Sequence, residues 1–406
     1  MAMRTTSVPV LVMQMSVGRL HHGSLGIVRS LGRLGVPVYV FRTGRWAPIP
    51  RSRYVAGVFA WRLAGLDPPT VLDDLCSVGR AIGRRAVLIP TDDVGAILTN
   101  DHAAELGEHF IVPQQPPGLA RRLASKQQMY WLCKHLGVPT PETVFPSGRA
   151  DVLQFLETAT LPVAVKAIDA GRIPLERGGK SVLIAHTAQE LLDYYDRVEV
   201  PEAPNLMLQE YIPGGAESVW MFNGYFDAHS ACLVGWTGQK IRQFPPYTGT
   251  TTLGIVRWNA AVAEATCDLM RRLGYRGILD CGWRYDQRDG QYKLLDVNPR
   301  IGATFRLFVD RAGLDVARAL YADLTGQPVR GGCAQDGRRW LVENQDVAAA
   351  RIYHRDGQLG LGEYVRSFRG VRETAWFAAD DPLPAAIALG AALVRGALGG
   401  ARDARG

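Results

Sequence analysis

The chain has 406 residues, 47% hydrophobic and 21% charged, which suffices for two or three globular domains with sizeable cores. The formal net charge is +7, but the arginines are dispersed without interleaved aromatic residues, so we expect no nucleic-acid partner. The longest apolar run, at residues 385–394, is too short to span a bilayer, and the opening residues resemble a strand rather than a signal segment. We therefore expect a cytoplasmic protein without a membrane partner.

The cysteines argue against disulfides and zinc sites, and the few lysines are candidate functional residues. The six cysteines show no CxxC spacing, which favours reduced core thiols over disulfides or zinc ligands. Lysine is rare among the 46 basic residues, so at each lysine we ask whether an ammonium point charge is needed. The lysines are Lys126, Lys134, Lys166, Lys180, Lys240 and Lys293.

Residues 1–117 predict a doubly wound α/β domain. Apolar runs at 8–15, 38–41 and 86–90 predict strands, and helical spacing separates them. Ligands of such sheets bind outside the carboxyl ends of the strands, which singles out a candidate pocket. Its residues are Gly18, His21, His22, Gly23, Asp92 and Asp93. A solvated loop is the alternative for the histidines, and helix N-capping is the alternative for the aspartates.

Residues 118–330 predict a second region built of both helices and strands. A helix is expected over 118–136, strands over 161–167 and 206–212, and an antiparallel meander from 217 to 244. The remaining residues, 331–406, predict a small appendage that ends in a helix at 385–398.

Two of the rare lysines lie where a phosphate could be bound. Lys166 leaves a packed strand at a fixed point, and Lys180 closes the sequence RGGK, where glycines allow close backbone approach to a ligand. In the following QEYIPGG segment, peptide groups could hold an adenine edge between Leu208 and Ile212. A surface position is the alternative for each lysine taken singly.

Farther along the chain, Lys240 and Arg242 stand two residues apart on a predicted strand. Side chains at this spacing face the same way, so the pair could reach charge that develops on a transferred phosphoryl group.

A predicted β-hairpin over 278–297, with its turn at 287–290, carries the most specific residues. Asp296 and Asn298 share one face of the returning strand, and Asp280 is expected opposite Asp296 within one residue of register. Two carboxylates and an amide oxygen form a hard-oxygen set suited to magnesium. A solvated hairpin with turn-capping side chains is the alternative.

These segments together resemble the ATP-grasp superfamily, in its carboxylate–amine ligase branch. The matching stretches are ASKQQMYWLCKHLGVPTP, LPVAVKA, GGKSVLI, LMLQEYIPGG and GYRGILD…KLLDVNPRIG. The resemblance covers the chain to about residue 330 and implies an ATP-grasp fold of α/β and α+β parts, with ATP and Mg²⁺ held between two subdomains. The implied residues are Lys126, Lys166, Lys180, Gln209, Glu210, Ile212 and Glu217 for the nucleotide, Asp280, Asp296 and Asn298 for magnesium, and Lys240, Arg242 and Arg300 for the reacting phosphate.

The implied activity is a ligase that activates a carboxylate as an acyl phosphate and joins it to an amine, with small molecules as substrates. Many relatives carry Glu where this chain has Asp296, whose shorter arm favours one magnesium ion over two. Phosphorylation of a substrate hydroxyl and a non-catalytic ATP-binding regulator remain alternatives. The sequence lacks the GxGxxG fingerprint of dinucleotide-binding enzymes, which argues against an oxidoreductase of that class. The oligomeric state stays open, with a homodimer as the candidate assembly.

Overall fold

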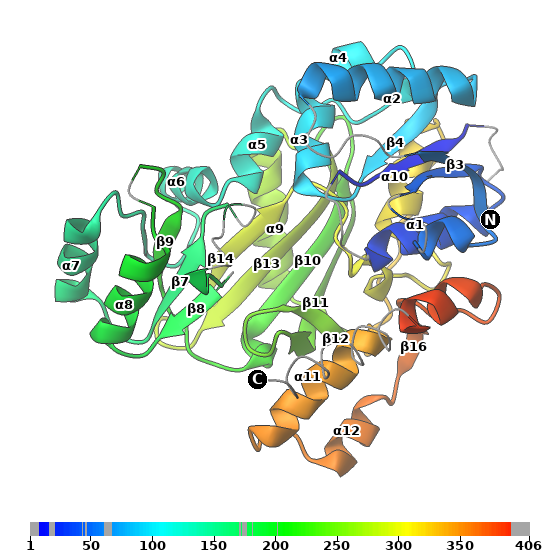
Figure 1. Cartoon of the computed structure of the whole chain (residues 1–406). Coiled ribbons are helices and arrows are strands. Elements are labelled where there is room, and N and C mark those ends of the chain that lie inside the picture. The colour runs from blue at the N-terminus through cyan, green and yellow to red at the C-terminus, as the bar shows by residue number, and fades with distance from the viewer. Residues whose placement is uncertain are drawn as a thin grey trace, which may run out of the picture. The chain divides into compact units, whose positions relative to one another are not determined.

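The computed structural model describes most of the chain, and its residues divide into two compact units (Figure 1). The larger unit comprises 1–120, 221–280 and 298–406, and the smaller unit comprises 121–220 and 281–297. The predicted boundaries at residues 117 and 330 stay predictions. The described residues are 8–15, 21–42, 44, 47–60, 67–169, 172, 177–180, 182–200 and 202–390.

The larger unit contains a five-stranded parallel sheet in the order β3-β2-β1-β4-β5. Val10 lies opposite Val38 on one side and opposite Val87 on the other, so the strand order reverses between β1 and β4. This arrangement confirms the predicted doubly wound sheet. Its strands are β1 (Val10–Met13), β2 (Val38–Arg42), β3 (Val55–Ala60), β4 (Ala86–Pro90) and β5 (Phe110–Ile111), and its helices are α1 (His22–Gly32), α2 (Pro68–Ile82), α3 (Asp93–Asp101) and α4 (Ala103–Leu106), with the 3-10 turn η1 (Ile49–Arg51).

Local signals set the helix ends. The carboxylate of Asp67 accepts from Thr70 N at the start of α2, where Pro68 occupies the first position and has no N–H to satisfy. The helix ends at Gly83, whose φ of 80° lies in the left-handed region that glycine adopts without strain. Capping residues visible in the sequence therefore set both ends of this helix.

A second sheet has seven strands in the order β14-β13-β10-β11-β12-β15-β16. Leu253 of β12 pairs with Leu341 of β15 in antiparallel fashion, and β16 joins β15 in parallel. The predicted appendage thus contributes two strands to this sheet. The strands of this sheet, together with the helices that lie between them in the chain, are β10 (Val219–Phe226), β11 (Cys232–Phe244), β12 (Thr250–Val256), α9 (Ala260–Leu273), β13 (Gly277–Asp286), β14 (Gln291–Asn298), η5 (Phe305–Leu307), α10 (Val316–Leu324), β15 (Arg339–Leu341), α11 (Glu343–Arg355), α12 (Leu361–Ser367) and β16 (Val371–Thr374).

The largest core cluster joins distant parts of the larger unit. Trp340 and Trp376 are buried in the same cluster as Val10 and Ile27, which shows that the carboxyl-terminal segment shares its core with the first βα unit. Of the helix predicted at 385–398, residues 383–390 are helical and the rest lies outside the described residues.

The smaller unit holds a four-stranded antiparallel sheet in the order β6-β9-β7-β8. Side chains alternate along its strands, so Val165 and Leu208 pack into one core cluster with α7 and α8. Lys166 and Gln209 face the opposite side. The elements are α5 (Leu119–Ala124), α6 (Lys126–Leu136), β6 (Thr143–Val144), α7 (Arg149–Thr158), β7 (Val163–Ala167), β8 (Val182–Ala185), α8 (Ala188–Val198), β9 (Leu206–Glu210) and η4 (Ala216–Ser218).

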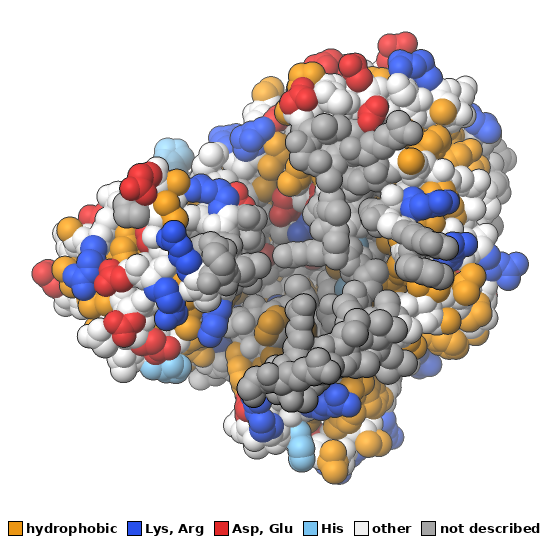
Figure 2. Space-filling model, viewed as in Figure 1, with side chains coloured by type: hydrophobic (Ala, Val, Ile, Leu, Met, Phe, Trp, Pro, Cys, Tyr) orange, Lys and Arg blue, Asp and Glu red, His pale blue; other side chains and the backbone are white. Residues whose placement is uncertain are grey.

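Over the smaller unit, basic and acidic side chains are interspersed on the face drawn in Figure 2. Within the described part of the chain, no helix combines the length and the apolar character needed to cross a membrane.

Candidate functional site

The hairpin that organises the site forms as the sequence predicts. β13 ends at Asp286, residues 287–290 form the turn, and β14 starts at Gln291. The N–H of Gly290 donates to Asp286 O at 2.9 Å, and the φ of this glycine is 71°, a value that favours glycine. The opposition of Asp280 and Asp296 stays a prediction.

Asp280 and Asn298 form a polar pair within the larger unit. Asn298 Nδ2 donates to Asp280 Oδ2 at 3.3 Å. A side chain at residue 302 would collide with the Asp280 carboxylate, so Gly302 lets the backbone pass close to it. In the smaller unit, Gly282 gives the same room to the exposed carboxylate of Asp296.

The donor set of these three residues fits magnesium, since carboxylate and amide oxygens are the ligands that hard cations prefer. Asp296 and Asn298 are two residues apart on β14, so their side chains leave the same face of the strand. Among the described residues, no group of three His, Cys, Asp or Glu side chains is placed to hold a metal ion. The candidate site therefore depends on the amide of Asn298.

Arg300 lies beside this pair, as expected. Its Nη2 donates to Asn298 Oδ1 at 3.0 Å, and its Nε donates to Asp93 Oδ1 at 2.9 Å. The guanidinium thus contacts both a candidate metal ligand and a residue of the first domain. The sequence singled out Asp93 for a different pocket and gave no sign of this pairing.

In the smaller unit, Lys166 and Gln209 meet on the face of the sheet away from α7 and α8. Lys166 Nζ donates to Gln209 Oε1 at 2.5 Å, and Gln209 Nε2 donates to Thr143 Oγ1 at 3.0 Å. Two predicted nucleotide contacts are therefore adjacent. The expected apolar wall from Leu208 is wrong, because strand alternation turns this side chain into the helix-covered core.

Lys126 lies at the end of the same sheet. It is the first residue of α6, which Ser125 caps, and its Nζ donates to Ala167 O at 2.5 Å and to Ile168 O at 3.2 Å. The ammonium thus lies at the carboxyl end of β7, one residue beyond Lys166.

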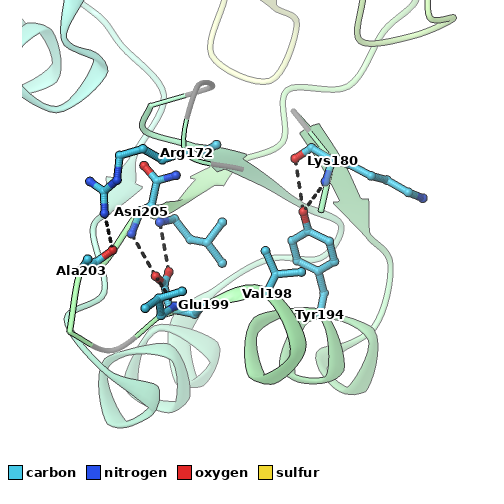
Figure 3. Close-up of a pocket in the computed structure, with 10 residues that line it drawn as sticks. Arg172, Lys180, Tyr194, Val198, Glu199, Ala203 and Asn205 are labelled. Atoms are coloured by element: carbon cyan, nitrogen blue, oxygen red, sulfur yellow. Dashed lines mark hydrogen bonds between the residues drawn. The ribbon is translucent and has the colours of Figure 1, made fainter. Parts of the chain in front are cut away.

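The face of the four-stranded sheet that is covered by α8 carries a cavity of about 200 Å³ (Figure 3). The hydroxyl of Tyr194 accepts from Lys180 N at 2.9 Å, and the Lys180 side chain extends away from the ring. Glu199 accepts from Asn205 N at 2.9 Å, and Arg172 Nη2 donates to Ala203 O at 2.7 Å. The cavity lies on the α8 side, opposite the face that carries Lys166.

Glu210 and Ile212, two residues expected to contact the nucleotide, are held by ion pairs and by burial. Glu210 forms ion pairs with Arg288 and Lys293, and its N–H donates to Glu142 O at 2.8 Å. Ile212 is buried, which is consistent with an apolar wall. A rare lysine, Lys293, received no role from the sequence, although its rarity was the available signal.

Two further carboxylates of the smaller unit, Asp286 and Glu217, are held by nearby donors. Hydrogen bonds from Arg288 and from Lys293 hold the pKa of the buried Asp286 carboxyl well below its usual range. Glu217 Oε1 accepts from Gly215 N at 3.0 Å, so this carboxylate binds its own turn within η4.

The expectation that Lys240 and Arg242 face the same way is wrong. The β11–β12 register shifts between these two residues, pairing Lys240 with Gly254 and Arg242 with Leu253, and such a bulge breaks the alternation of side chains. Lys240 Nζ donates to Gly249 O at 2.9 Å. Arg242 is buried in a bidentate ion pair that its Nε and Nη2 form with Asp346, at 2.9 and 2.7 Å.

The pocket predicted in the first domain divides into separate roles. Asp92 caps α3 by accepting from Gly95 N at 2.9 Å, as the capping alternative requires. His21 caps α1, and burial lowers the pKa of its neighbour His22 to about 3. Gly18 lies outside the described residues.

No protein-family model matches the chain. Among curated proteins it is similar to D-aspartate ligase of Enterococcus faecium (strain Aus0004), 27% identical over 249 residues that cover 59% of each sequence. The matched part thus spans about three fifths of that relative's length.

Solved structures extend the likeness over most of the chain. N5-carboxyaminoimidazole synthetase from Staphylococcus aureus, complexed with ADP, superposes with a TM-score of 0.62 at 12% identity, covering 86% of this chain and 87% of that one. L-amino acid ligase from Bacillus licheniformis superposes with a TM-score of 0.57 at 16% identity, covering 79% and 75%. At these identities the structural likeness shows the fold.

Proposed function

We propose that this chain, whose sequence motifs resemble those of ATP-grasp carboxylate–amine ligases, is an ATP- and magnesium-dependent ligase that joins a carboxylate to an amine. The supporting observation is that Arg300 and Asp280 are both hydrogen-bonded to Asn298, which places a cation beside a carboxylate and an amide in one cluster. Phosphoryl transfer needs this juxtaposition, because magnesium ligands and a phosphate-binding cation must act on the same oxygens.

The nucleotide would be bound through the face of the four-stranded sheet that lies opposite α7 and α8. Lys166 presents an ammonium there, and Gln209 holds it in place at 2.5 Å. Lys126 supplies a second ammonium at the carboxyl end of β7. Glu210 and the buried Ile212 would border the adenine, while the exposed Lys180 is the candidate for the outer phosphate.

Magnesium would be held by Asp280, Asp296 and Asn298, and when bound it neutralises charge on the phosphoryl oxygens. Carboxylates resist attack by amines because oxide is a poor leaving group, and phosphorylation replaces it with phosphate. The guanidinium of Arg300 would bind an oxyanion of the activated carboxylate or of the tetrahedral species formed on amine attack. Lys240 remains a candidate for this region, whereas Arg242 is held in its buried ion pair.

The substrates proposed are small molecules, with amino acids as the first class to test, since both ligase relatives are named for them. We propose a cytoplasmic setting, where ATP is supplied, and a homodimer as the assembly, which light scattering after gel filtration would check.

The direct test is ADP release with MgATP in the presence of pooled carboxylates, including D- and L-amino acids, with and without pooled amines. ADP that forms only when both pools are present, together with an amide product identified by mass spectrometry, supports the ligase. ADP formation with a hydroxyl compound alone would instead indicate a kinase. Tight ATP binding without turnover across the screen would favour a regulator, and no ATP binding would refute the proposal.

A further inference from the structure

Arg300 donates hydrogen bonds to three acceptors. Besides the bonds to Asp93 and Asn298, its Nη1 donates to Ile301 O at 3.3 Å. The Arg300 side chain is 18% exposed and that of Asp93 is 44% exposed, so the pair lies at the edge of the solvent. Because a guanidinium is planar, acceptors on its Nε and on one Nη fix the direction of the whole fork.

The two adjacent aspartates of α3 have separate tasks. Asp92 is the N-cap, and its two oxygens accept from Gly95 N at 2.9 Å and from Met15 N at 2.7 Å. Asp93 follows as the first helical residue and is not the cap, so its carboxylate is directed to Arg300 instead. Since α3 follows directly on β4 of the parallel sheet, this carboxylate stands on a rigid element.

We propose that Asp93 is a positioning residue that aims the Arg300 guanidinium for the reaction at the Asp280–Asn298 pair. The proposal rests on the proposed ligase function for its catalytic consequence. If Asp93 is removed, the next carboxylate in this hydrogen-bonded network is that of Asp280. It is linked to Arg300 only through Asn298. Arg300 would then be drawn toward Asp280 and would compete there with the metal ion.

Substitutions at residue 93 separate the hydrogen bond from the charge. Asp93→Asn keeps an oxygen acceptor but removes the charge, whereas Asp93→Ala removes both. Val94→Ala is the matched control, because Val94 is exposed on the same helical turn. Asp92 is unsuitable as a control, since its loss would remove the cap of α3.

The first readout is the Nε–H signal of Arg300 in the NMR spectrum of the full chain labelled with ¹⁵N-arginine, assigned by its loss in Arg300→Lys. We expect slow solvent exchange of this proton in the wild type and in Val94→Ala, faster exchange in Asp93→Asn, and loss of the signal in Asp93→Ala. An unchanged signal in Asp93→Ala would overturn the proposal, because the pairing would then have no effect on the guanidinium.

The second readout is catalytic. We expect Asp93→Ala to lower kcat for ADP formation roughly ten-fold, as loss of a charge-assisted hydrogen bond predicts, with the KM for ATP and the thermal midpoint unchanged. Asp93→Asn should recover part of this loss. If Asp93→Ala has wild-type kcat, the positioning role is refuted even where the NMR signal changes.

If the substrate screen yields no turnover, the ligase proposal fails separately from the positioning proposal. The second readout is then the affinity of the MgADP-loaded chain for inorganic phosphate, measured by calorimetry. Positioning predicts weaker phosphate binding in Asp93→Ala than in Val94→Ala, and equal affinity in both variants would refute it.

Discussion

Arg242 and Asp346 form a bidentate ion pair whose side chains are 3% and 1% exposed, linking β11 to α11. Thr252 Oγ1 adds a donor to Asp346 at 2.9 Å, and Ser367 Oγ accepts from Arg242 Nη1 at 2.8 Å. Every charged group of this pair is therefore satisfied inside the protein. The pair ties the carboxyl-terminal helices to the seven-stranded sheet.

Arg242→Ala is expected to lower the free energy of unfolding by about 3–5 kcal/mol, because it leaves a buried carboxylate without its partner. Urea unfolding at pH 7 measures this change. The control is Arg149→Ala, which breaks the exposed pair with Asp196 and should change stability by no more than about 1 kcal/mol. A stable Arg242→Ala variant that has lost only ADP formation would instead restore the predicted catalytic role.

Asp296→Ala and Asn298→Ala are expected to abolish ADP formation while leaving the fold intact. Asp296 is exposed at the end of β14, so its removal should change stability by about 0.5 kcal/mol or less. Turnover with MgATP and the thermal midpoint are measured together, and Gln291→Ala, exposed at the start of the same strand, is the control. Wild-type turnover in both variants would remove the magnesium hypothesis.

Lys166→Met is expected to weaken ATP binding roughly ten-fold or more, because it deletes a charge-assisted contact on the proposed nucleotide face. Calorimetric titration with ATP measures the dissociation constant. Lys134→Met serves as the control, since this lysine forms an exposed ion pair with Glu142 in the same unit. Equal affinity in the two variants would place the nucleotide elsewhere.

His22 is expected to make stability depend on pH. Burial, and to a lesser degree the charge of His21, lowers the His22 pKa from 6.5 to about 3. Between these values the unfolded chain binds a proton that the folded chain rejects, so stability falls as pH falls below about 6.5, by up to about 1.4 kcal/mol per pH unit.

Urea unfolding of wild type and His22→Gln at pH 7 and pH 5 checks this dependence. The loss of stability on acidification should be smaller in His22→Gln, while His229→Gln, at an exposed histidine, should behave as wild type. The same pH dependence in all three proteins would show that His22 is not the group that titrates.

Much of the candidate site follows from local sequence. Alternation along a strand puts Asp296 and Asn298 on one face. The turn at 287–290 ends at Gly290, whose positive φ is a backbone conformation that glycine adopts without strain. Lys166 stands out in the sequence because lysine is rare in this chain. Strand alternation and tight turns depend on residues that are close together in the chain, so they can be predicted from the sequence.

The ion-pair partners of the charged side chains are determined by the tertiary structure and could not be predicted from the sequence. Arg242 resembled a catalytic cation in the sequence, but a one-residue bulge turned it toward Asp346, more than a hundred positions away. Asp93 resembled a capping residue or a ligand contact, yet it binds Arg300. The periodicity of a strand fixes the face that a side chain occupies, whereas ion pairs across long stretches of chain depend on how whole elements pack, which no local pattern encodes.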